Sequence, residues 1–273
     1  GMTEPELIPV EERPAVLTVA GLDPSGGAGI ATDAAVIRAF GLHPLTVLTS
    51  VVVENTTRVS RRHDLPAGLV QEQLAVMSEE FLLGAVKIGM LANPAIVEVL
   101  AAWVAERPRL PMVLDPVLRA SSGGALADPG LVDALRAQLL PRTRVLTPNL
   151  EEASALTGLQ ITDRDQVPEA AQRLLQLGPQ WVLVKGGHLP RGRAADYLVG
   201  PDAALWLEES RSDRDVRGTG CALAAALAAG LARGESVPDA AAAAKAFITQ
   251  AIADSYVAGR GRFLGLLPRD AEE

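Results

Sequence analysis

Short apolar segments alternate with longer segments of helical spacing along most of this chain. Apolar runs of this length, each ended by a polar or glycine residue, are typical of buried strands, and we expect strands at residues 15–20, 45–53, 85–88, 111–114, 144–146 and 181–184. Helices are expected at residues 28–40, 69–81, 94–105, 131–139, 220–233 and 237–257, and a hairpin is expected to pair 197–199 with 204–207. This alternation predicts an α/β fold with a mainly parallel central sheet and helices on both faces.

The chain of 273 residues contains no Pro/Gly/Ser linker and no abrupt shift in composition. We therefore expect one domain over residues 1–273, with residues 1–13 as a flexible tail. Polar or glycine residues follow the carboxyl ends of six of the expected strands, where ligands bind in open α/β sheets. These residues are Asp23, Glu54, Met90 with the preceding glycine, Asp115, Asn149 and Lys185. They predict a site along one rim of the sheet.

A glycine-rich segment, Gly218-Thr219-Gly220-Cys221, precedes an alanine-rich helical stretch. Glycines allow the backbone N–H groups to converge, and a helix start adds a partial positive charge. The segment therefore predicts an anion hole that stabilises a transferring phosphoryl group, with a thiol of lowered pKa at its rim. The alternative is an ordinary helix start with an inert, buried cysteine.

A second glycine cluster occupies residues 21–29, again between an expected strand and an expected helix. Asp23 in this segment is a candidate for binding a substrate hydroxyl group. The alternative is a tight turn in which Asp23 or Ser25 caps the helix. The segment matches neither the Walker pattern nor the dinucleotide fingerprint, which makes dinucleotide chemistry a poor candidate.

Asp115, Asn149 and Glu152 supply carboxylate and amide oxygens to the same rim. Magnesium bound with nucleotide phosphates takes a few protein oxygen ligands and water, so these residues are candidate ligands. Asn149 and Glu152 are also spaced for a capping box at a helix start, and the two interpretations are compatible.

Composition argues against several classes of partner. The net charge is −8 and aromatic residues make up 3% of the chain, so neither a basic stripe nor a set of stacking platforms for nucleic acid is expected. No apolar run reaches the roughly 20 residues that a membrane-spanning helix needs. The single cysteine fits a reducing compartment, and we expect a cytoplasmic location.

Six segments, in this order, resemble the hydroxymethylpyrimidine/phosphomethylpyrimidine kinase family of thiamine biosynthesis, which is ribokinase-like in fold. The segments cover residues 20–29, 87–91, 113–117, 146–152, 184–188 and 218–221. The resemblance implies transfer of the γ-phosphoryl group of ATP, with Mg²⁺, to the primary hydroxyl of 4-amino-5-hydroxymethyl-2-methylpyrimidine and then to its monophosphate. It also permits a homodimer.

By this resemblance, Cys221 lies where the family has its proposed catalytic base, and Gly218, Thr219 and Gly220 form the anion hole. The substrate pocket corresponds to Ala28, Val52 and Met90, with Asp23 and Glu54. Lys185 lies in the nucleotide region. The magnesium and phosphate side corresponds to Asn149, Asp115 and Glu152.

Three positions depart from the family pattern. Glu54 stands where the family usually has a glutamine whose amide pairs with the ring, and a carboxylate only accepts hydrogen bonds. Arg217 stands where histidine is common, and Ser121 where lysine is common. Arg217 or Arg119 is a candidate to rebuild the phosphate contact. The alternatives are a pyridoxal-type vitamin kinase on the same scaffold and a catalytically weak ligand-binding or regulatory relative.

Overall fold

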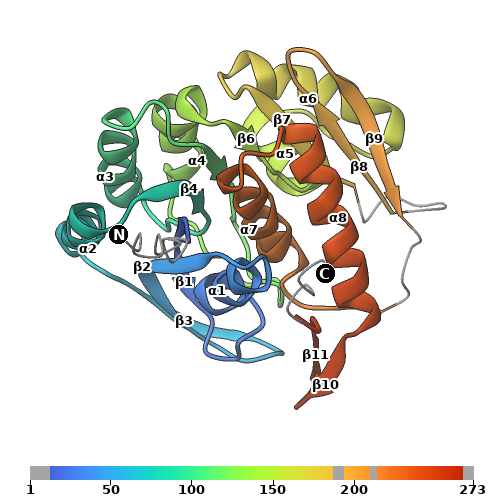
Figure 1. The fold of residues 1–273 in the computed structure, drawn as a ribbon. Helices are drawn as coiled ribbons and strands as arrows, with labels where there is room; N and C mark the ends of the chain where they lie inside the picture. The colour runs from blue at the N-terminus through green and yellow to red at the C-terminus, as the bar shows by residue number, and fades with distance from the viewer. Residues whose placement is uncertain (1–12, 187–193, 210–213, 267–273) are drawn as a thin grey trace, which may run out of the picture.

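The computed structural model describes residues 13–186, 194–209 and 214–266, so residues 1–12 of the expected tail, Gly187 and His188 lie outside the described residues. Nine strands form one sheet in the order β3-β2-β1-β4-β5-β6-β7-β8-β9 within the described part of the chain (Figure 1). The strands are β1 (Ala15–Leu22), β2 (His43–Glu54), β3 (Val59–Asp64), β4 (Leu83–Ile88), β5 (Met112–Leu114), β6 (Val145–Leu146), β7 (Trp181–Lys185), β8 (Ala194–Val199) and β9 (Ala204–Glu209).

The strands from β2 to β7 in this order run parallel, whereas β3, β8 and β9 are antiparallel to their neighbours. The expected α/β fold with a mainly parallel sheet is therefore confirmed, as is the hairpin formed by β8 and β9.

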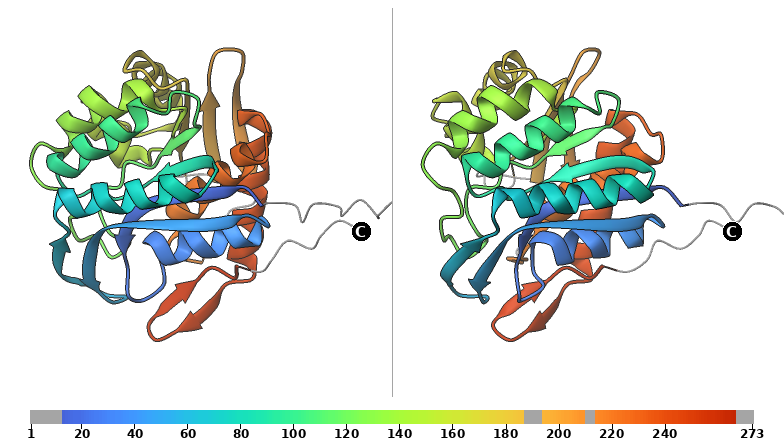
Figure 2. Two further views of the ribbon diagram at one scale, coloured as in Figure 1. Left: turned by 60° about the vertical axis from the view of Figure 1, so that its left-hand side comes forward. Right: turned by 90° about the vertical axis from the view of Figure 1, so that its left-hand side faces the viewer.

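Helices cover both faces of the sheet (Figure 2). One face packs against α1 (Gly29–Ala39), α7 (Thr219–Ala232) and α8 (Val237–Ala253). The other face packs against α2 (Ala67–Glu80), α3 (Pro94–Ala105), α4 (Leu131–Ala134), α5 (Leu150–Thr157) and α6 (Val167–Gln176). A π-helical turn, Leu135–Leu139, and a 3-10 turn, Leu140–Arg142, continue α4, and a further 3-10 turn, Arg164–Gln166, precedes α6.

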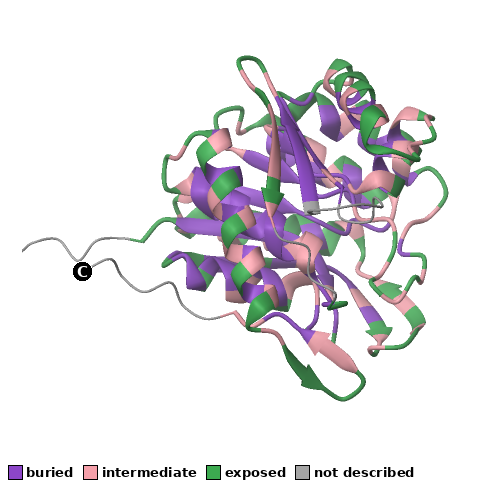
Figure 3. Ribbon diagram, turned by 90° about the vertical axis from the view of Figure 1, so that its right-hand side faces the viewer, coloured by how far each residue is buried: buried purple, intermediate pink, exposed green. Residues whose placement is uncertain are grey.

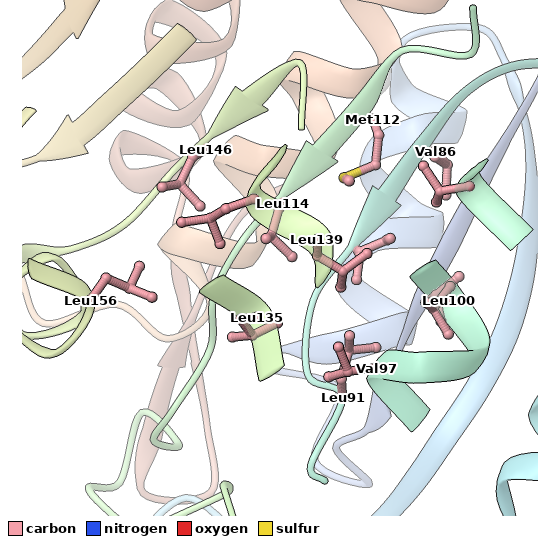
Figure 4. Packing of buried hydrophobic residues seen from close by; sticks show 14 of the residues in the cluster. Val86, Leu91, Val97, Leu100, Met112, Leu114, Leu135, Leu139, Leu146 and Leu156 are labelled. Atoms are coloured by element: carbon pink, nitrogen blue, oxygen red, sulfur yellow. The ribbon is translucent and has the colours of Figure 1, made fainter. Parts of the chain in front are cut away.

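Alternate residues of the parallel strands enter two separate cores. Leu17 and Val19 of β1 join the cluster under α2 to α6, while Val16 joins the cluster under α1, α7 and α8. Burial on both faces explains why these strands are continuous apolar runs (Figure 3). Figure 4 shows the first cluster, in which side chains from neighbouring strands, such as Leu114 and Leu146, meet those of the covering helices.

The sheet has a topological switch point beside β1. The chain leaves β1 through α1 and adds β2 on one side, whereas β4 pairs with the other side of β1. Open α/β sheets bind ligands at the carboxyl ends of the strands where the order reverses. Asp23 follows β1 and Met90 follows β4, so both residues lie at this switch point.

The predicted C-terminal end of the helix at residues 237–257 is wrong. Helix α8 stops at Ala253, and residues 256–258 instead form β10 (Tyr256–Ala258), which pairs with β11 (Gly261–Phe263). The hairpin is held by stacking of Tyr256 on Phe263 at 6.0 Å between ring centroids and by a 3.2 Å hydrogen bond from Arg262 Nη1 to the Ser255 carbonyl oxygen. These tertiary contacts override the helical tendency of the stretch.

Candidate active site

The loop after β1 fixes Asp23 at the edge of the site. Its Oδ1 accepts hydrogen bonds from the backbone N–H of Ser25 at 2.9 Å and from the Ser25 hydroxyl at 2.7 Å. Its Oδ2 is buried and has no hydrogen-bond partner among the described residues. A buried carboxylate oxygen without a partner is unfavourable, so Asp23 offers an acceptor that a ligand can satisfy.

The start of α7 lies directly against this loop. Gly218, the N-cap residue, has φ +75°, and a Cβ atom there would lie 1.8 Å from the Gly27 carbonyl oxygen. No side chain caps α7, so its first backbone N–H groups, beginning at Thr219 and Gly220, are available to an anion. This is the arrangement that the anion-hole prediction requires.

The prediction of a lowered pKa for Cys221 is wrong. Burial raises the pKa of the Cys221 thiol to about 11, and the nearby ammonium group of Lys87 only partly offsets this effect. Loss of solvation is the largest influence on this thiol.

A buried ion pair that the sequence reasoning missed lies near Cys221. Lys87 of β4 and Asp33 of α1 are both fully buried, and Lys87 Nζ lies 2.8 Å from Asp33 Oδ2. Thr18 donates a 2.5 Å hydrogen bond to the same carboxylate oxygen. The charge of Asp33 raises the pKa of Lys87, which keeps the ammonium charged. The sequence signal for this buried ion pair is the presence of a lysine inside the otherwise apolar segment of β4.

Lys185 connects the anion hole to the acidic side chains of the rim. Its Nζ lies 3.2 Å from Asp115 Oδ1, and a Cβ atom on Gly220 would lie 2.9 Å from the same nitrogen. The sequence-predicted residues of the helix start and of the strand ends therefore come together here.

The capping box predicted at Asn149 is confirmed. Asn149 Oδ1 accepts from the Glu152 N–H at 2.7 Å, and Glu152 Oε1 accepts from the Asn149 N–H at 2.9 Å. Burial raises the pKa of Glu152 to about 7, and Asp115 adds to the rise while Lys185 opposes it. Two carboxyl groups, those of Asp115 and Glu152, thus act on the single ammonium group of Lys185.

The described residues contain no cluster of three or more His, Cys, Asp or Glu side chains that could hold a metal ion. A magnesium ion that completes its shell with water and nucleotide phosphates needs only one or two carboxylates. The excess of acid at Asp115 and Glu152 fits such an ion.

A buried aspartate missed by the sequence reasoning fixes the loop after β7. Asp196 Oδ1 accepts from the Gly186 N–H at 3.2 Å, and its Oδ2 lies 3.0 Å from Lys245 Nζ of α8. Asp196 thereby positions the backbone that follows Lys185.

An apolar patch lies at the other end of the site. Val52 and Met90 belong to a small buried cluster with Ala92 and Leu126, and a Cβ atom on Gly21 would lie 2.8 Å from Met90 Sδ. The predicted pocket residue Ala28 is the partly exposed N-cap of α1.

Glu54 and Arg217 meet beside this patch. Arg217 Nη2 donates to Glu54 Oε1 at 3.3 Å, and Arg217 Nη1 donates to the Thr56 carbonyl oxygen at 3.1 Å. Arg217 is thus engaged by the end of β2 and the turn that follows it. Arg119, the other candidate for a phosphate contact, lies 2.5 Å from Glu151 at an exposed position.

A sheet with strand-end carboxylates, a lysine and an uncapped helix start defines a phosphotransferase of the ribokinase-like class. The sequence model of the family described as phosphomethylpyrimidine kinase matches residues 23–264. The chain belongs to this family.

Comparisons with individual proteins agree with this family assignment. The chain is 41% identical over 261 residues to the hydroxymethylpyrimidine/phosphomethylpyrimidine kinase of Streptomyces coelicolor, covering 95% of this chain and 96% of that protein. Its fold matches the ADP complex of Bacillus subtilis pyridoxal kinase with a TM-score of 0.85 and 34% identity, over 92% of this chain and 96% of the other. It matches the phosphomethylpyrimidine kinase of Clostridium difficile with a TM-score of 0.78 and 34% identity, over 88% and 100%. None of the helices in the described residues is long and apolar enough to cross a membrane.

Proposed function

We propose that this protein transfers the γ-phosphoryl group of ATP to the primary hydroxyl of 4-amino-5-hydroxymethyl-2-methylpyrimidine and then to the resulting monophosphate, in thiamine biosynthesis. The observation that carries the proposal is the contact between Gly218 and the Gly27 carbonyl oxygen, because it sets the uncapped start of α7 beside Asp23 and the apolar patch. The family membership and the activity named for the Streptomyces relative support the same substrate.

Each predicted residue has a role in this reaction. The ring lies on Val52, Met90 and Ala28, Glu54 meets its edge, and Asp23 Oδ2 accepts from the substrate hydroxyl. The N–H groups of Gly218, Thr219 and Gly220 stabilise the charge of the transferring phosphoryl group. Cys221 takes the hydroxyl proton late in the transfer, as expected where phosphoryl transfer rests mainly on positioning.

ATP and Mg²⁺ are the proposed cofactors. We assign the nucleotide phosphates to Lys185 and Asn149, which pair as a β-bridge, because Lys185 Nζ lies next to Gly220 at the helix start. The ADP complex of the Bacillus relative supports a nucleotide site in this fold. Asp115 and Glu152 would hold the magnesium ion, which supplies charge neutralisation for the phosphates. We further propose that residues 1–273 act as one domain, in the cytoplasm, with the apolar helices permitting a homodimer and without nucleic-acid or membrane partners.

A second candidate is a pyridoxal-type vitamin kinase, favoured by the fold match to pyridoxal kinase. Parallel ATP-consumption assays with magnesium on hydroxymethylpyrimidine, its monophosphate and pyridoxal separate the two. We expect preference for the pyrimidine and its phosphate. Preference for pyridoxal would establish the second candidate, and no turnover of any of the three would support a weak ligand-binding or regulatory relative.

A further inference from the structure

Arg217 is the residue that precedes the uncapped start of α7, and both its backbone and its side chain are held in place. Its backbone N–H donates to the Arg262 carbonyl oxygen of β11 at 3.0 Å. Its guanidinium donates from Nη1 to the Thr56 carbonyl oxygen at 3.1 Å and from Nη2 to Glu54 Oε1 at 3.3 Å. Arg217 is therefore fixed to the β10–β11 hairpin, to the end of β2 and to the turn after β2.

The Arg217 side chain lies against the loop after β1. A Cβ atom on Gly27 would lie 2.9 Å from Arg217 Nε, and a Cβ atom on Gly218 would lie 1.8 Å from the Gly27 carbonyl oxygen. Gly27 is thus in close contact with the side chain of one residue and with the backbone of the next. A shift of this loop toward α7 would therefore displace Arg217, Gly218 or both.

Arg217 also acts on Asp23 by charge. Arg217 Nη2 lies 3.8 Å from Asp23 Oδ2, which is beyond hydrogen-bond distance, and the two side chains are 9% and 4% exposed. Burial strengthens the attraction between opposite charges. Asp23 Oδ2 has no hydrogen-bond partner among the described residues. The guanidinium therefore attracts the carboxylate and leaves this oxygen to accept from a substrate hydroxyl.

These contacts link segments that are far apart in the sequence. Thr56 and Glu54 lie 161 and 163 positions before Arg217. A guanidinium suits such a link because its planar fork donates in several directions, whereas an ammonium group is a point charge. The contacts meet one residue before Gly218, where the backbone N–H groups of the anion hole begin.

We propose that Arg217 is a positioning residue for phosphoryl transfer. It holds the start of α7, the loop after β1 and the turn after β2 in one arrangement. In this arrangement Asp23 Oδ2 reaches the acceptor hydroxyl, while the N–H groups of Thr219 and Gly220 reach the phosphoryl group that the hydroxyl receives. Arg217 itself touches neither the hydroxyl nor the phosphoryl group. This inference rests on the proposed function, because the positioned groups are those assigned to the transfer.

The first test is Arg217→Ala, assayed with magnesium-ATP and 4-amino-5-hydroxymethyl-2-methylpyrimidine. We expect kcat to fall about 100-fold, because a displacement of about 1 Å at the reacting centre has an effect of this size. The Kd of magnesium-ATP, measured by calorimetry without the pyrimidine, should change less than about threefold, because the lost interaction acts on the transfer step. The matched control is Arg107→Ala, which removes a partly buried guanidinium bound to the Trp103 carbonyl oxygen of α3 and should keep the wild-type kcat.

Chemical rescue separates loss of the guanidinium from general damage. Arg217→Ala removes the atoms of an ethylguanidinium ion, so this ion fits the space that the substitution leaves. Millimolar ethylguanidinium should raise the turnover of the variant about tenfold and leave that of wild type unchanged. Ethylammonium, which has the same charge without the fork, should raise it less. Arg217→Lys, which keeps the charge but loses the fork, should lower kcat about tenfold.

Hydrogen exchange measures the positioning without any substrate. In Arg217→Ala, the backbone amides of residues 25–29, 55–58 and 218–222 should exchange at least about tenfold faster than in wild type, and those of α3 should be unchanged. Ethylguanidinium should slow exchange in the same three segments. A side chain that only stabilised the fold would instead change exchange across the whole sheet.

The inference is overturned if Arg217→Ala keeps a kcat within about threefold of wild type. It is also overturned if turnover falls without faster exchange in the three segments, or if ethylammonium restores turnover as well as ethylguanidinium does. If Arg217→Ala does not fold, Arg217→Lys decides, and an unchanged kcat overturns the inference.

Failure of the proposed function has a different signature. If the wild-type protein phosphorylates neither the pyrimidine nor its monophosphate, the proposed function is overturned, and hydrogen exchange alone decides the inference about Arg217. If the wild-type protein turns over and Arg217→Ala matches it, the proposed function stands and the inference fails.

Discussion

Gly218 lies so close to Gly27 that a Cβ atom on Gly218 would stand 1.8 Å from the Gly27 carbonyl oxygen. This contact joins the start of α7 to the loop after β1, two segments from opposite ends of the sequence. The glycine clusters at residues 21–29 and 218–220, each ambiguous alone, therefore border the same candidate site.

Gly218→Ala should lower both stability and turnover. The φ of +75° costs a non-glycine residue about 1–3 kcal/mol. The clash must also move the start of α7 away from the loop after β1. A displacement near 1 Å at a reacting centre can lower turnover about 100-fold. Gly234→Ala is the control, because Gly234 has φ +82° and a Cβ atom there would meet no other atom within 4 Å. Equal losses of turnover in the two variants would contradict the importance of the contact.

Cys221→Ser should lower turnover far more than it lowers nucleotide affinity. General-base catalysis contributes about 10²- to 10⁴-fold, and the substitution keeps the size of the side chain. Single-turnover kinetics and nucleotide titration measure the two quantities. A rate within a few-fold of wild type would show that Cys221 is a packing residue and that the reaction relies on positioning and the anion hole.

Alkylation of Cys221 by iodoacetamide should be slow at neutral pH. Because burial raises the thiol pKa to about 11, the rate should rise about tenfold per pH unit through the range from pH 7 to pH 9. The chain has one cysteine, so mass spectrometry gives the rate directly. A rate that levels off near neutral pH would indicate a thiolate, as the helix start alone predicts.

Lys87→Met should destabilise the protein by about 3–5 kcal/mol, because it leaves the fully buried Asp33 without its counter-charge. Adding Asp33→Leu should restore much of the loss, since the remaining buried charge is removed. Denaturant unfolding measures both. Arg173→Met, which removes the partner of Glu169 in an exposed pair at 3.7 Å, should change stability little. Similar effects of the two single substitutions would contradict the importance of burial.

The stability contributed by Glu54 should fall as pH rises from about 4.5 to about 7. The pKa of Glu54 is raised in the folded state, so in this window the folded state binds more protons than the unfolded state, and stability decreases with pH. Glu54→Gln should lack this component, which is read from the difference between its unfolding free energy and that of wild type. The exposed substitution Glu72→Gln should follow wild type. A constant difference for Glu54→Gln would contradict the raised pKa.

The elements predicted correctly from the sequence are those whose pattern of apolar residues matches their burial in the fold. Residues 15–20 form a continuous apolar run because β1 is covered on both faces. Strand β3 escaped prediction because Val59–Asp64 is a mostly charged edge strand whose position depends on pairing with β2. Helix α6 was also missed, although its apolar residues have helical spacing. The end of α8 depends on the hairpin contacts of Tyr256, which the local sequence does not reveal.

Strand ends and glycine segments allow the candidate site residues to be proposed from the sequence, but they do not reveal the partners of those residues. Lys87 pairs with Asp33 across 54 positions, and Arg217 pairs with Glu54 across 163 positions. Contacts of this range depend on strand order. The same limit explains the error at Cys221, since the helix start is visible in the sequence and the burial of the thiol is not.

The β10–β11 hairpin braces Arg217 from outside the sheet. Its Arg262 carbonyl oxygen accepts from the Arg217 N–H at 3.0 Å, and a Cβ atom on Gly261 would meet Thr56 at 2.7 Å. Figure 1 shows β10 and β11 projecting beyond the nine-stranded sheet. During synthesis, all nine strands of the sheet leave the ribosome before residue 263 does. A nascent chain can therefore assemble its sheet while Arg217 still lacks this hydrogen bond. In the finished protein, a local opening of the hairpin would loosen Arg217 without disturbing the core.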